Sequence, residues 1–247
     1  MKFVATRRLL LLTLGLTLCA QSPAEEIEGR ARPIKEVSVS SPVFQEVINA
    51  FAVEEGDTVK EGQVLVQLRC EKEQLEFERT QKLIELAEFK YKGANSLFKD
   101  KMGSQEKALE EKAQLELAQI MHRAAEVSLK EKTVRAPLSG IVVKKHKEAG
   151  ESVDRVEKLV DIINIDRVFV QFYLDPKLMP SLQIEDPVKV KFPAIGPQAF
   201  QAKVVFIDPS IDAGSGLFRV KVRIENLDHQ IKANMRGVAD FGTVPSR

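Results

Sequence analysis

Most of the chain alternates hydrophobic and polar residues in short runs, and one long stretch departs from this pattern. Runs rich in Val and Ile, such as residues 64–68 and 168–174, are separated by Gly, Pro, Asp and Asn. Alternation of this kind, bounded by turn residues, is typical of β-strands. Residues 71–131 instead contain no Pro and are dominated by Glu, Lys, Gln, Leu and Ala, which are strong helix formers. We therefore predict a mainly β protein with a helical insert.

The insert predicts an antiparallel hairpin of two helices, each about 28 residues and 40 Å long. Its glycines, Gly93 and Gly103, lie near the middle, so Gly103-Ser104 is the expected turn. Ser104 would cap the second helix, with Glu106 in the first turn. Leucines and small apolar residues at coiled-coil spacing predict the seam between the helices. The predicted seam residues are Leu75, Leu83, Leu86, Ala94, Leu97, Leu117, Ile120, Ala124 and Val127.

Such a hairpin can project as an arm or pack against the β-rich body as a helical subdomain. The apolar seam is narrow, and the other faces of both helices carry many Glu and Lys residues. A narrow apolar stripe covers one partner helix but not a whole domain surface. The pattern therefore favours a projecting arm.

The segments that flank the insert, residues 50–68 and 140–162, resemble each other at an offset of 94 positions. The matched pairs are Gly56 with Gly150, Asp57 with Glu151, Val59 with Val153, and Leu65 with Leu159. Glycine suits a turn position with φ > 0. Two similar β segments separated by a long insert predict two halves of one β-sandwich.

The rest of the chain provides a second β module and its connections. From residue 164 to residue 243, five or six short strands at regular spacing predict a small β-barrel or sandwich. Residues 25–39 are expected to be a linker or a lead-in strand, and residues 244–247 a short tail.

The N-terminus predicts an exported protein. Lys2, Arg7 and Arg8 precede the short apolar run Leu9–Leu18, and small residues follow, so residues 1–24 read as a signal peptide. An uncleaved anchor would need an apolar run of about 20 residues. Cys19 lies where bacterial lipoproteins carry a lipidated cysteine, but Leu18 before it is large for that motif, so a lipid anchor is not favoured.

Charge and cysteine content argue against nucleic-acid binding and against a disulfide framework. The chain has 37 Lys and Arg, and the signal peptide removes three of them, leaving 34 against 36 Asp and Glu. An exported chain with no basic surplus is a poor match for nucleic acid. Cys70, then the only cysteine, has no disulfide partner and is expected to be a small buried residue.

Several motifs resemble those of the membrane fusion proteins, the periplasmic adaptor subunits of Gram-negative efflux and secretion systems (HlyD-like and RND-type adaptors). The similarity covers about residues 40–243. It rests on Gly56-Asp57, Gly62-Gln63, Val134-Arg135-Ala136-Pro137, Gly140, Gly150, Val153, residues 207–209 (IDP) and residues 223–226 (RIEN).

The resemblance implies a lipoyl-like barrel-sandwich hybrid, formed by residues 40–70 and 132–163, around a coiled-coil hairpin at 71–131, followed by a β-barrel domain at 164–243. It also implies a periplasmic protein associated with the inner membrane of a Gram-negative bacterium. Its expected partners are an RND or ABC transporter, an outer-membrane channel, and copies of itself in a trimeric or hexameric ring. Because the chain ends at Arg247, most of the family's membrane-proximal domain is expected to be absent.

The candidate site for a partner is the hairpin tip, because the family tip carries an Arg, a Leu four residues on and a Ser seven further. Leu97 and Ser104 match this spacing, whereas Gly93 replaces the Arg. The candidate tip residues are Leu97, Lys101, Met102, Gly103 and Ser104. Residues expected to shape the turns of the lipoyl-like halves are Gly56, Gly62, Pro137, Gly140 and Gly150.

No residue pattern indicates catalysis, a metal or a cofactor. His122, His146 and His229 lack metal-ligand spacing, and His122 is expected to be a solvated helix residue. In carrier domains the modified Lys stands at the hairpin that is replaced here by the helical insert. The alternatives to an adaptor are a non-enzymatic lipoyl-like carrier or a module that presents a ligand or metal to a transporter, and an orphan regulatory adaptor.

Overall fold

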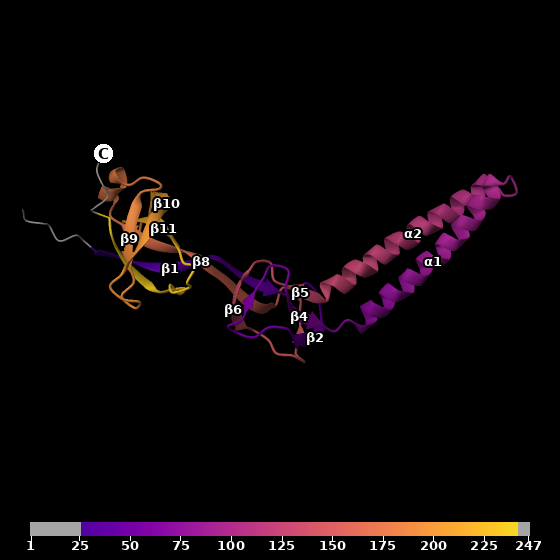
Figure 1. The fold of residues 1–247 in the computed structure, drawn as a ribbon, viewed down its shortest axis with the longest axis horizontal. Coiled ribbons are helices and arrows are strands. Elements are labelled where there is room, and N and C mark those ends of the chain that lie inside the picture. Colours follow the sequence, from indigo (N-terminus) through magenta and orange to yellow (C-terminus); the bar gives the residue numbers. More distant parts are fainter. Residues whose placement is uncertain (1–25, 242–247) are drawn as a thin grey trace, which may run out of the picture.

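The computed structural model describes residues 26–241. The expected signal peptide, Cys19 and the tail at 244–247 lie outside these residues. The described chain is elongated, with one β module at one end, a second in the middle, and two long helices that project from the other end (Figure 1). The predicted fold class, mainly β with a helical hairpin, is confirmed.

The central β module combines two halves that are far apart in the sequence. The first half contributes β2 (Glu46–Phe51), β3 (Thr58–Val59) and β4 (Val64–Leu68). The second contributes β5 (Thr133–Arg135), β6 (Gly140–Lys145) and β7 (Ser152–Val153). β2 and β6 show the same order of buried and exposed positions. Their inward side chains share one core with β4, in which Ile48 and Leu65 are almost completely buried.

The sequence repeat corresponds to an exchange of backbone hydrogen bonds between the halves. Gly56 N donates to Val142 O, and Gly150 N donates to Ile48 O, both at 2.8 Å. Both glycines have positive φ, +98° and +91°. Each glycine turn therefore closes on the opposite half, which brings the two ends of the helical insert to one place.

Two long strands connect the central module with the terminal one. β1 (Glu26–Ser40) and β8 (Lys158–Leu174) pair antiparallel, from Gly29 opposite Phe172 to Ser40 opposite Lys158. Residues 26–39 are thus a lead-in strand rather than a linker. The boundary expected at residues 163–164 lies inside β8, because one strand passes through both cores with its side chains alternating between the faces.

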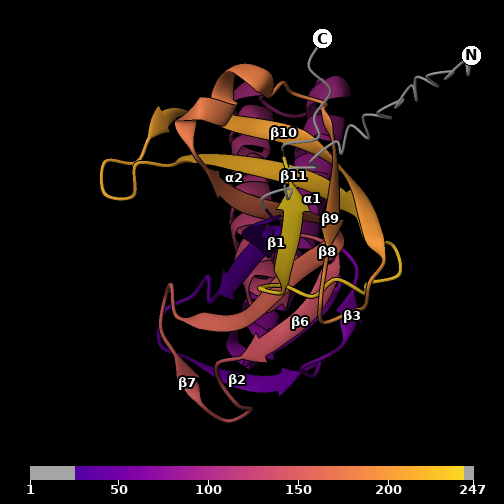
Figure 2. The same cartoon turned by 90° about the vertical axis from the view of Figure 1, so that its left-hand side faces the viewer.

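The terminal module is a β-barrel that uses the ends of the same two strands. It adds β9 (Pro187–Lys191), β10 (Ala199–Ile211), β11 (Phe218–Glu225) and β12 (Arg236–Asp240), with a 3-10 helix η1 (Pro176–Ser181) after β8. The strand order is β1-β12-β9-β10-β11-β8, and β8 pairs back to β1 (Figure 2). β11 alternates buried and half-buried positions, and Phe172, Phe192 and Phe218 fill the core.

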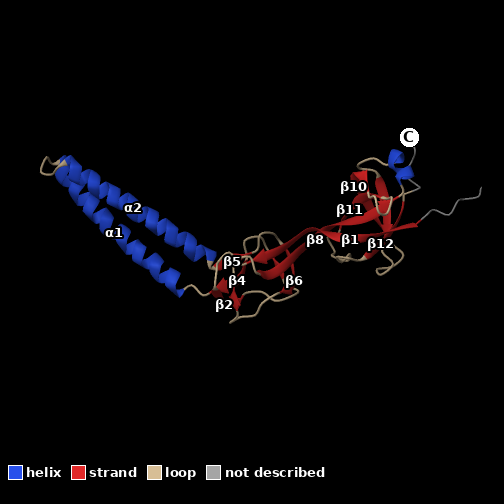
Figure 3. Ribbon diagram, turned by 180° about the vertical axis from the view of Figure 1, so that it is seen from behind, coloured by secondary structure: helices blue, strands red, loops and turns tan. Residues whose placement is uncertain are grey.

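The arm consists of α1 (Glu71–Lys99), α2 (Gln105–Glu131) and the connecting residues 100–104 (Figure 3). Ser104 caps α2, since its Oγ accepts a hydrogen bond from Lys107 N at 3.1 Å, and Glu106 lies in the first turn. The predicted helix cap is confirmed.

Candidate interaction site

The distal end of the arm brings together the five residues predicted for partner binding. Leu97 lies in the last turn of α1, Lys101, Met102 and Gly103 lie in the connection, and Ser104 caps α2. Met102 N donates to Leu97 O at 2.8 Å, which fixes the turn. The side chains of Met102 and Leu97 are 72% and 49% exposed. The tip therefore presents two apolar side chains on an ordered turn.

A groove of about 620 Å³ begins at the tip and runs between the helices. Gly93 forms part of its wall, and a Cβ atom at this position would meet nothing within 4 Å. Phe89 lies beside the groove with 77% of its surface exposed. Lys107 lies on the other helix, and hydrogen bonds from its ammonium to Glu111 and Glu110 raise its pKa. Gly93, at the position expected to hold the family's Arg, thus leaves this wall of the groove without a side chain, between Phe89 and the charged Lys107.

The seam between the helices differs from the predicted one. Most of the shielded positions follow heptad spacing, and these are mostly small or polar. They are Glu73, Phe77, Thr80, Ile84, Ala87, Tyr91 and Ala94 in α1, and Ala108, Glu111, Leu115, Ala118, His122, Ala125 and Leu129 in α2. From the predicted set, only Leu83 and Ala94 are partly shielded. The prediction followed the largest aliphatic side chains, whereas small residues allow the helix axes to approach closely.

The predicted seam residues of α2 are instead exposed and form, together with Leu109, an apolar stripe, which we call the outer stripe: Leu109, Leu117, Ile120, Ala124 and Val127. Leu117, Ile120 and Val127 are 51%, 54% and 55% exposed. Their 3–4 spacing keeps them on one side of the helix. The arm therefore carries a second apolar face suited to another helix.

One polar pair interrupts the alanine-rich seam. Thr80 is almost completely buried, and its Oγ1 lies 3.0 Å from His122 Nδ1. The same hydroxyl lies within 3.0 Å of the carbonyl oxygens of Glu76 and Phe77, and the Phe77 and His122 rings are 4.5 Å apart. His122 was expected to be solvated, which is wrong, because the 4–3 spacing places it in the seam. A buried polar pair among the small residues of a seam favours one helix register.

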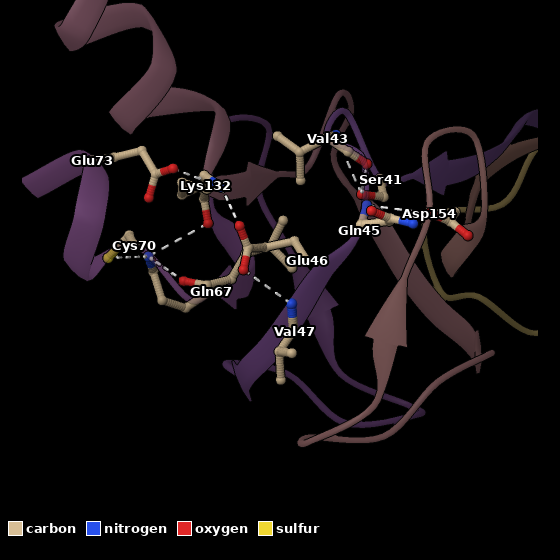
Figure 4. Close-up of polar contacts among 11 residues, drawn as sticks. Ser41, Val43, Gln45, Glu46, Val47, Gln67, Cys70, Glu73, Lys132 and Asp154 are labelled. Carbon is tan, nitrogen blue, oxygen red and sulfur yellow. Dashed lines mark hydrogen bonds and ion pairs between the residues drawn. The ribbon is translucent and has the colours of Figure 1, made fainter.

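A shielded lysine anchors the arm to the central module (Figure 4). Lys132 follows α2, and its side chain is 9% exposed. Its Nζ contacts Glu46 of β2 and lies 3.1 Å from Glu73 of α1. Burial opposes ionisation at both ends of the contact. The hydrogen bond nevertheless lowers the pKa of Glu46 and raises that of Lys132.

Residues around this lysine extend the network. Gln67 Nε2 lies 3.4 Å from Lys132 O and 3.7 Å from Cys70 Sγ. Cys70, expected to be buried, is half-buried at the N-cap of α1. We call Glu46, Glu73 and Lys132 the root network. This network was not predicted from the sequence, although a lysine between a long helix and a strand with buried residues was an available signal.

The glycines and the proline singled out in the repeat have different surroundings. Gly62 has a φ of +81° and ends a turn after β3, whereas Gly140 is the first residue of β6. A Cβ atom on Gly140 would lie 2.3 Å from Ile163 O of the neighbouring strand. Pro137 is exposed in the short loop that precedes β6. Gly140 therefore permits a close strand contact rather than a turn.

Neither a metal centre nor a membrane span is found in the described part of the chain. Within residues 26–241, no group of three or more His, Cys, Asp or Glu side chains could hold a metal ion. In the same range, no helix combines the length and apolar composition needed to cross a membrane. His146 pairs with Asp161 at 2.7 Å and His229 with Asp166 at 2.8 Å. These two histidines thus have acidic partners within the β modules.

Two family models match successive parts of the chain. A CzcB-like, barrel-sandwich hybrid domain matches residues 35–164, and a CusB-like, beta-barrel domain matches residues 167–243. The nodulation protein NolF of Rhizobium meliloti (strain 1021) is 26% identical over 244 residues, which cover 91% of this chain. This chain spans 65% of the length of that relative.

Two solved structures share the fold. A MacA-MexA chimeric protein with the Pseudomonas aeruginosa MexA α-hairpin domain superposes with a TM-score of 0.77 at 15% identity, over 87% of this chain and 78% of the other. The membrane fusion protein Spr0693 from Streptococcus pneumoniae R6 gives 0.69 at 15% identity, over 87% and 99%. At these identities the likeness concerns the fold alone.

Proposed function

Because the chain belongs to the membrane fusion proteins, the family of periplasmic adaptors, we propose that it links an inner-membrane transporter to an outer-membrane channel during export. The observation that supports this proposal is the arm, which projects from the β body with large apolar side chains turned outward (Figure 1). The family is non-enzymatic, so the proposed role is mechanical. The proposed location is the periplasm of a Gram-negative bacterium, in association with the inner membrane.

The proposed contact with the channel is the tip. Leu97 and Met102 are exposed on an ordered turn, and the groove beside them is lined by Gly93 and Phe89. A helical end of a channel subunit could insert an apolar side chain there, while Lys101 contacts an acidic or carbonyl group. Each such contact is small, so several copies of the adaptor would be needed for stable docking.

The proposed ring supplies those copies. The two β modules of three or six chains would pack side by side above a transporter of the RND or ABC type. In a closed ring, every arm points the same way, because each chain is related to the next by rotation about one axis. The arms would then reach the channel together.

Replacing the tip residues tests the proposal. We expect the double variant Leu97→Ser and Lys101→Glu to accumulate normally and fold, but to lose co-purification with the outer-membrane channel and export. Ser104 is left in place because it caps α2. Lys177→Glu is the control for charge, since the side chain of this lysine is 90% exposed and its element, η1, belongs to the terminal β-barrel rather than to the arm. Unchanged export by the tip variant would refute the tip assignment.

A further inference from the structure

The central module contains one type of backbone turn four times, at residues 54–57 and 60–63 in the first half and at 148–151 and 154–157 in the second. The third residue is Gly56 in 54–57 and Gly150 in 148–151, whereas the pair 60–63 and 154–157 is unequal. In the first half, Gln63 N donates to Lys60 O at 3.0 Å, and Lys60 N donates to Gln63 Oε1 at 3.0 Å. In the second half, Glu157 N donates to Asp154 O at 3.1 Å, and Asp154 N donates to Glu157 Oε2 at 2.9 Å. Residues 60–63 and 154–157 are therefore structural equivalents, at the same offset as the sequence repeat.

Each turn is also held by the opposite half in the same way. Gly62 N donates to Ala136 O at 2.8 Å, and Val156 N donates to Ser41 O at 3.0 Å. In return, Ala136 N donates to Gln63 O and Ser41 N donates to Glu157 O, at 2.8 and 2.9 Å. The amide of the third residue and the carbonyl of the fourth are thus bound to the opposite half in both turns.

The two turns differ in the residue at this third position. Gly62 has a φ of +81°, and Val156 has a φ of +72°. Glycine adopts such a conformation freely, whereas a β-branched residue is strained there. Burial does not compensate, because the Val156 side chain is 74% exposed. Strained residues that persist without a packing reason point to function.

A second exposed apolar residue lies in the segment that bonds to the turn of Val156. The segment that holds this turn, residues 42–45 before β2, is one residue longer than its equivalent, residues 137–139 before β6. The longer segment exposes Phe44, which is 66% accessible, and bonds to the turn through Gln45 N and Asp154 Oδ1 at 3.2 Å (Figure 4). We call these two exposed residues, Phe44 and Val156, the apolar knob.

The equivalent surface in the other half is polar. Gly62 leaves open space where Val156 has a side chain, and Glu61 N bonds to Ser139 Oγ. Lys60, Glu61 and Arg135 surround this turn, and Arg135 donates to Gly62 O at 2.9 Å. We call Lys60, Glu61, Gly62 and Arg135 the glycine face.

The two surfaces lie on opposite sides of the central module. β3, which leads into the first turn, and β7, which leads into the second, lie at opposite edges when the molecule is viewed along its long axis (Figure 2). Their charges are also opposite in balance. Asp154 and Glu157 outnumber Arg155 at the knob, with Glu157 and Glu151 sharing Lys147. At the glycine face, the two cations Lys60 and Arg135 outnumber the one anion, Glu61.

We propose that the apolar knob of one chain binds the glycine face of the next, so that the two unequal turns form the head-to-tail contact of a ring. A ring needs two different, complementary surfaces on each chain, and these must lie on opposite sides. The module provides them by making the two halves of its repeat unequal. This inference rests on the proposed self-assembly and names the residues that carry it.

Crosslinking between single-cysteine chains tests the contact, in full-length mature protein with Cys70→Ser. We expect a short bismaleimide to join chains with Val156→Cys to chains with Lys60→Cys, whereas neither variant is crosslinked to itself. A chain that carries both substitutions should give a ladder of oligomers. Efficient crosslinking of Val156→Cys to itself would show a symmetric contact and overturn the proposal.

A substitution that separates strain from binding gives a second test. Val156→Asn places a residue that tolerates positive φ at the knob, so the melting temperature should rise by roughly 2–4 °C while self-association measured by sedimentation weakens. Val143→Asn is the matched control, because Val143 is 43% exposed within β6 and has no positive φ. This control should lower the melting temperature slightly and leave self-association unchanged.

The outcomes distinguish this inference from the proposed function. If Val156→Asn keeps the oligomer and the melting temperature of the unmodified chain, the knob has no role and the inference fails, while the arm can still dock to a channel. If the oligomer is lost in Val156→Asn but the isolated tip variant still exports, the ring contact stands and the tip assignment fails.

Discussion

The β body buries its large apolar side chains, whereas the arm exposes most of its own. In the terminal β module, Phe172, Phe192 and Phe218 are completely buried, and in the central module Leu65 and Leu159 are completely buried. In the arm, the buried residues are Thr80, Ala108, Ala118 and Ala125, whereas most of the leucines are exposed. The body therefore gains stability from its own core, whereas the arm keeps its apolar surface for contacts with other chains.

This difference makes the arm dependent on its ends. Two helices that share a thin alanine seam bury little apolar area, and isolated helices are only marginally stable in water. The root network holds one end through Lys132, and the ordered turn at 100–104 holds the other. A projecting adaptor arm thus combines a stiff shape with an exposed binding surface.

The largest effect is expected from truncating a side chain in the body. Phe218→Ala should lower the free energy of unfolding by about 3–5 kcal/mol, because it leaves a cavity in a closed core. Leu117→Ala, on the outer stripe, should change it by less than about 0.5 kcal/mol. Denaturant unfolding followed by circular dichroism measures both. Similar losses in the two variants would contradict the contrast between body and arm.

The next largest change in unfolding free energy is expected from breaking the root network. Lys132→Met should cost about 2 kcal/mol, because Glu46 and Glu73 are then left half-buried without a cation. Lys130→Met is the matched control two residues away, since Lys130 is 72% exposed and pairs only with Glu126. The control should cost less than about 0.5 kcal/mol. Equal costs for the two variants would show that Lys132 does not anchor the arm.

The same network predicts a pH dependence. The pKa of Glu46 is lowered from 4.5, so its stabilising contribution is complete above pH 4.5 and disappears as the pH falls below that value. The pKa of Lys132 is raised from 10.5, so its contribution is complete below pH 10.5 and disappears as the pH rises further. The difference in unfolding free energy between the unmodified chain and Lys132→Met should therefore be constant between these limits and shrink outside them. A difference that changes near pH 7 would contradict this assignment.

The smallest change in unfolding free energy is expected from variants in the seam between α1 and α2. Thr80→Val removes the hydroxyl that pairs with His122 and should cost about 1 kcal/mol. Combining it with His122→Leu should recover most of this loss, because an apolar pair fits the seam. A double-mutant cycle measures the coupling. Strictly additive costs would show that the two side chains act independently.

Some of the architecture could be predicted because it depends on local sequence. The helical insert lacks Pro and is rich in helix formers, and Gly56 and Gly150 mark equivalent turns. The seam could not be identified from leucine spacing, since α2 has two apolar faces and the one with smaller residues faces α1. Contacts between distant positions, such as Lys132 with Glu46, depend on the closed fold. The repeat did contain a signal for the knob, because Val156 aligns with Gly62.

Photocrosslinking at the tip in living cells tests the central claim most directly. A photoreactive residue in place of Met102, which is 72% exposed, should crosslink to an outer-membrane channel protein. The same residue in place of Tyr173, which is 49% exposed on the β-barrel module, should not. A crosslink from Met102 to the channel, lost in the Leu97→Ser and Lys101→Glu variant, is the predicted result. Crosslinks from Met102 to the inner-membrane transporter, with none to a channel, would contradict the account.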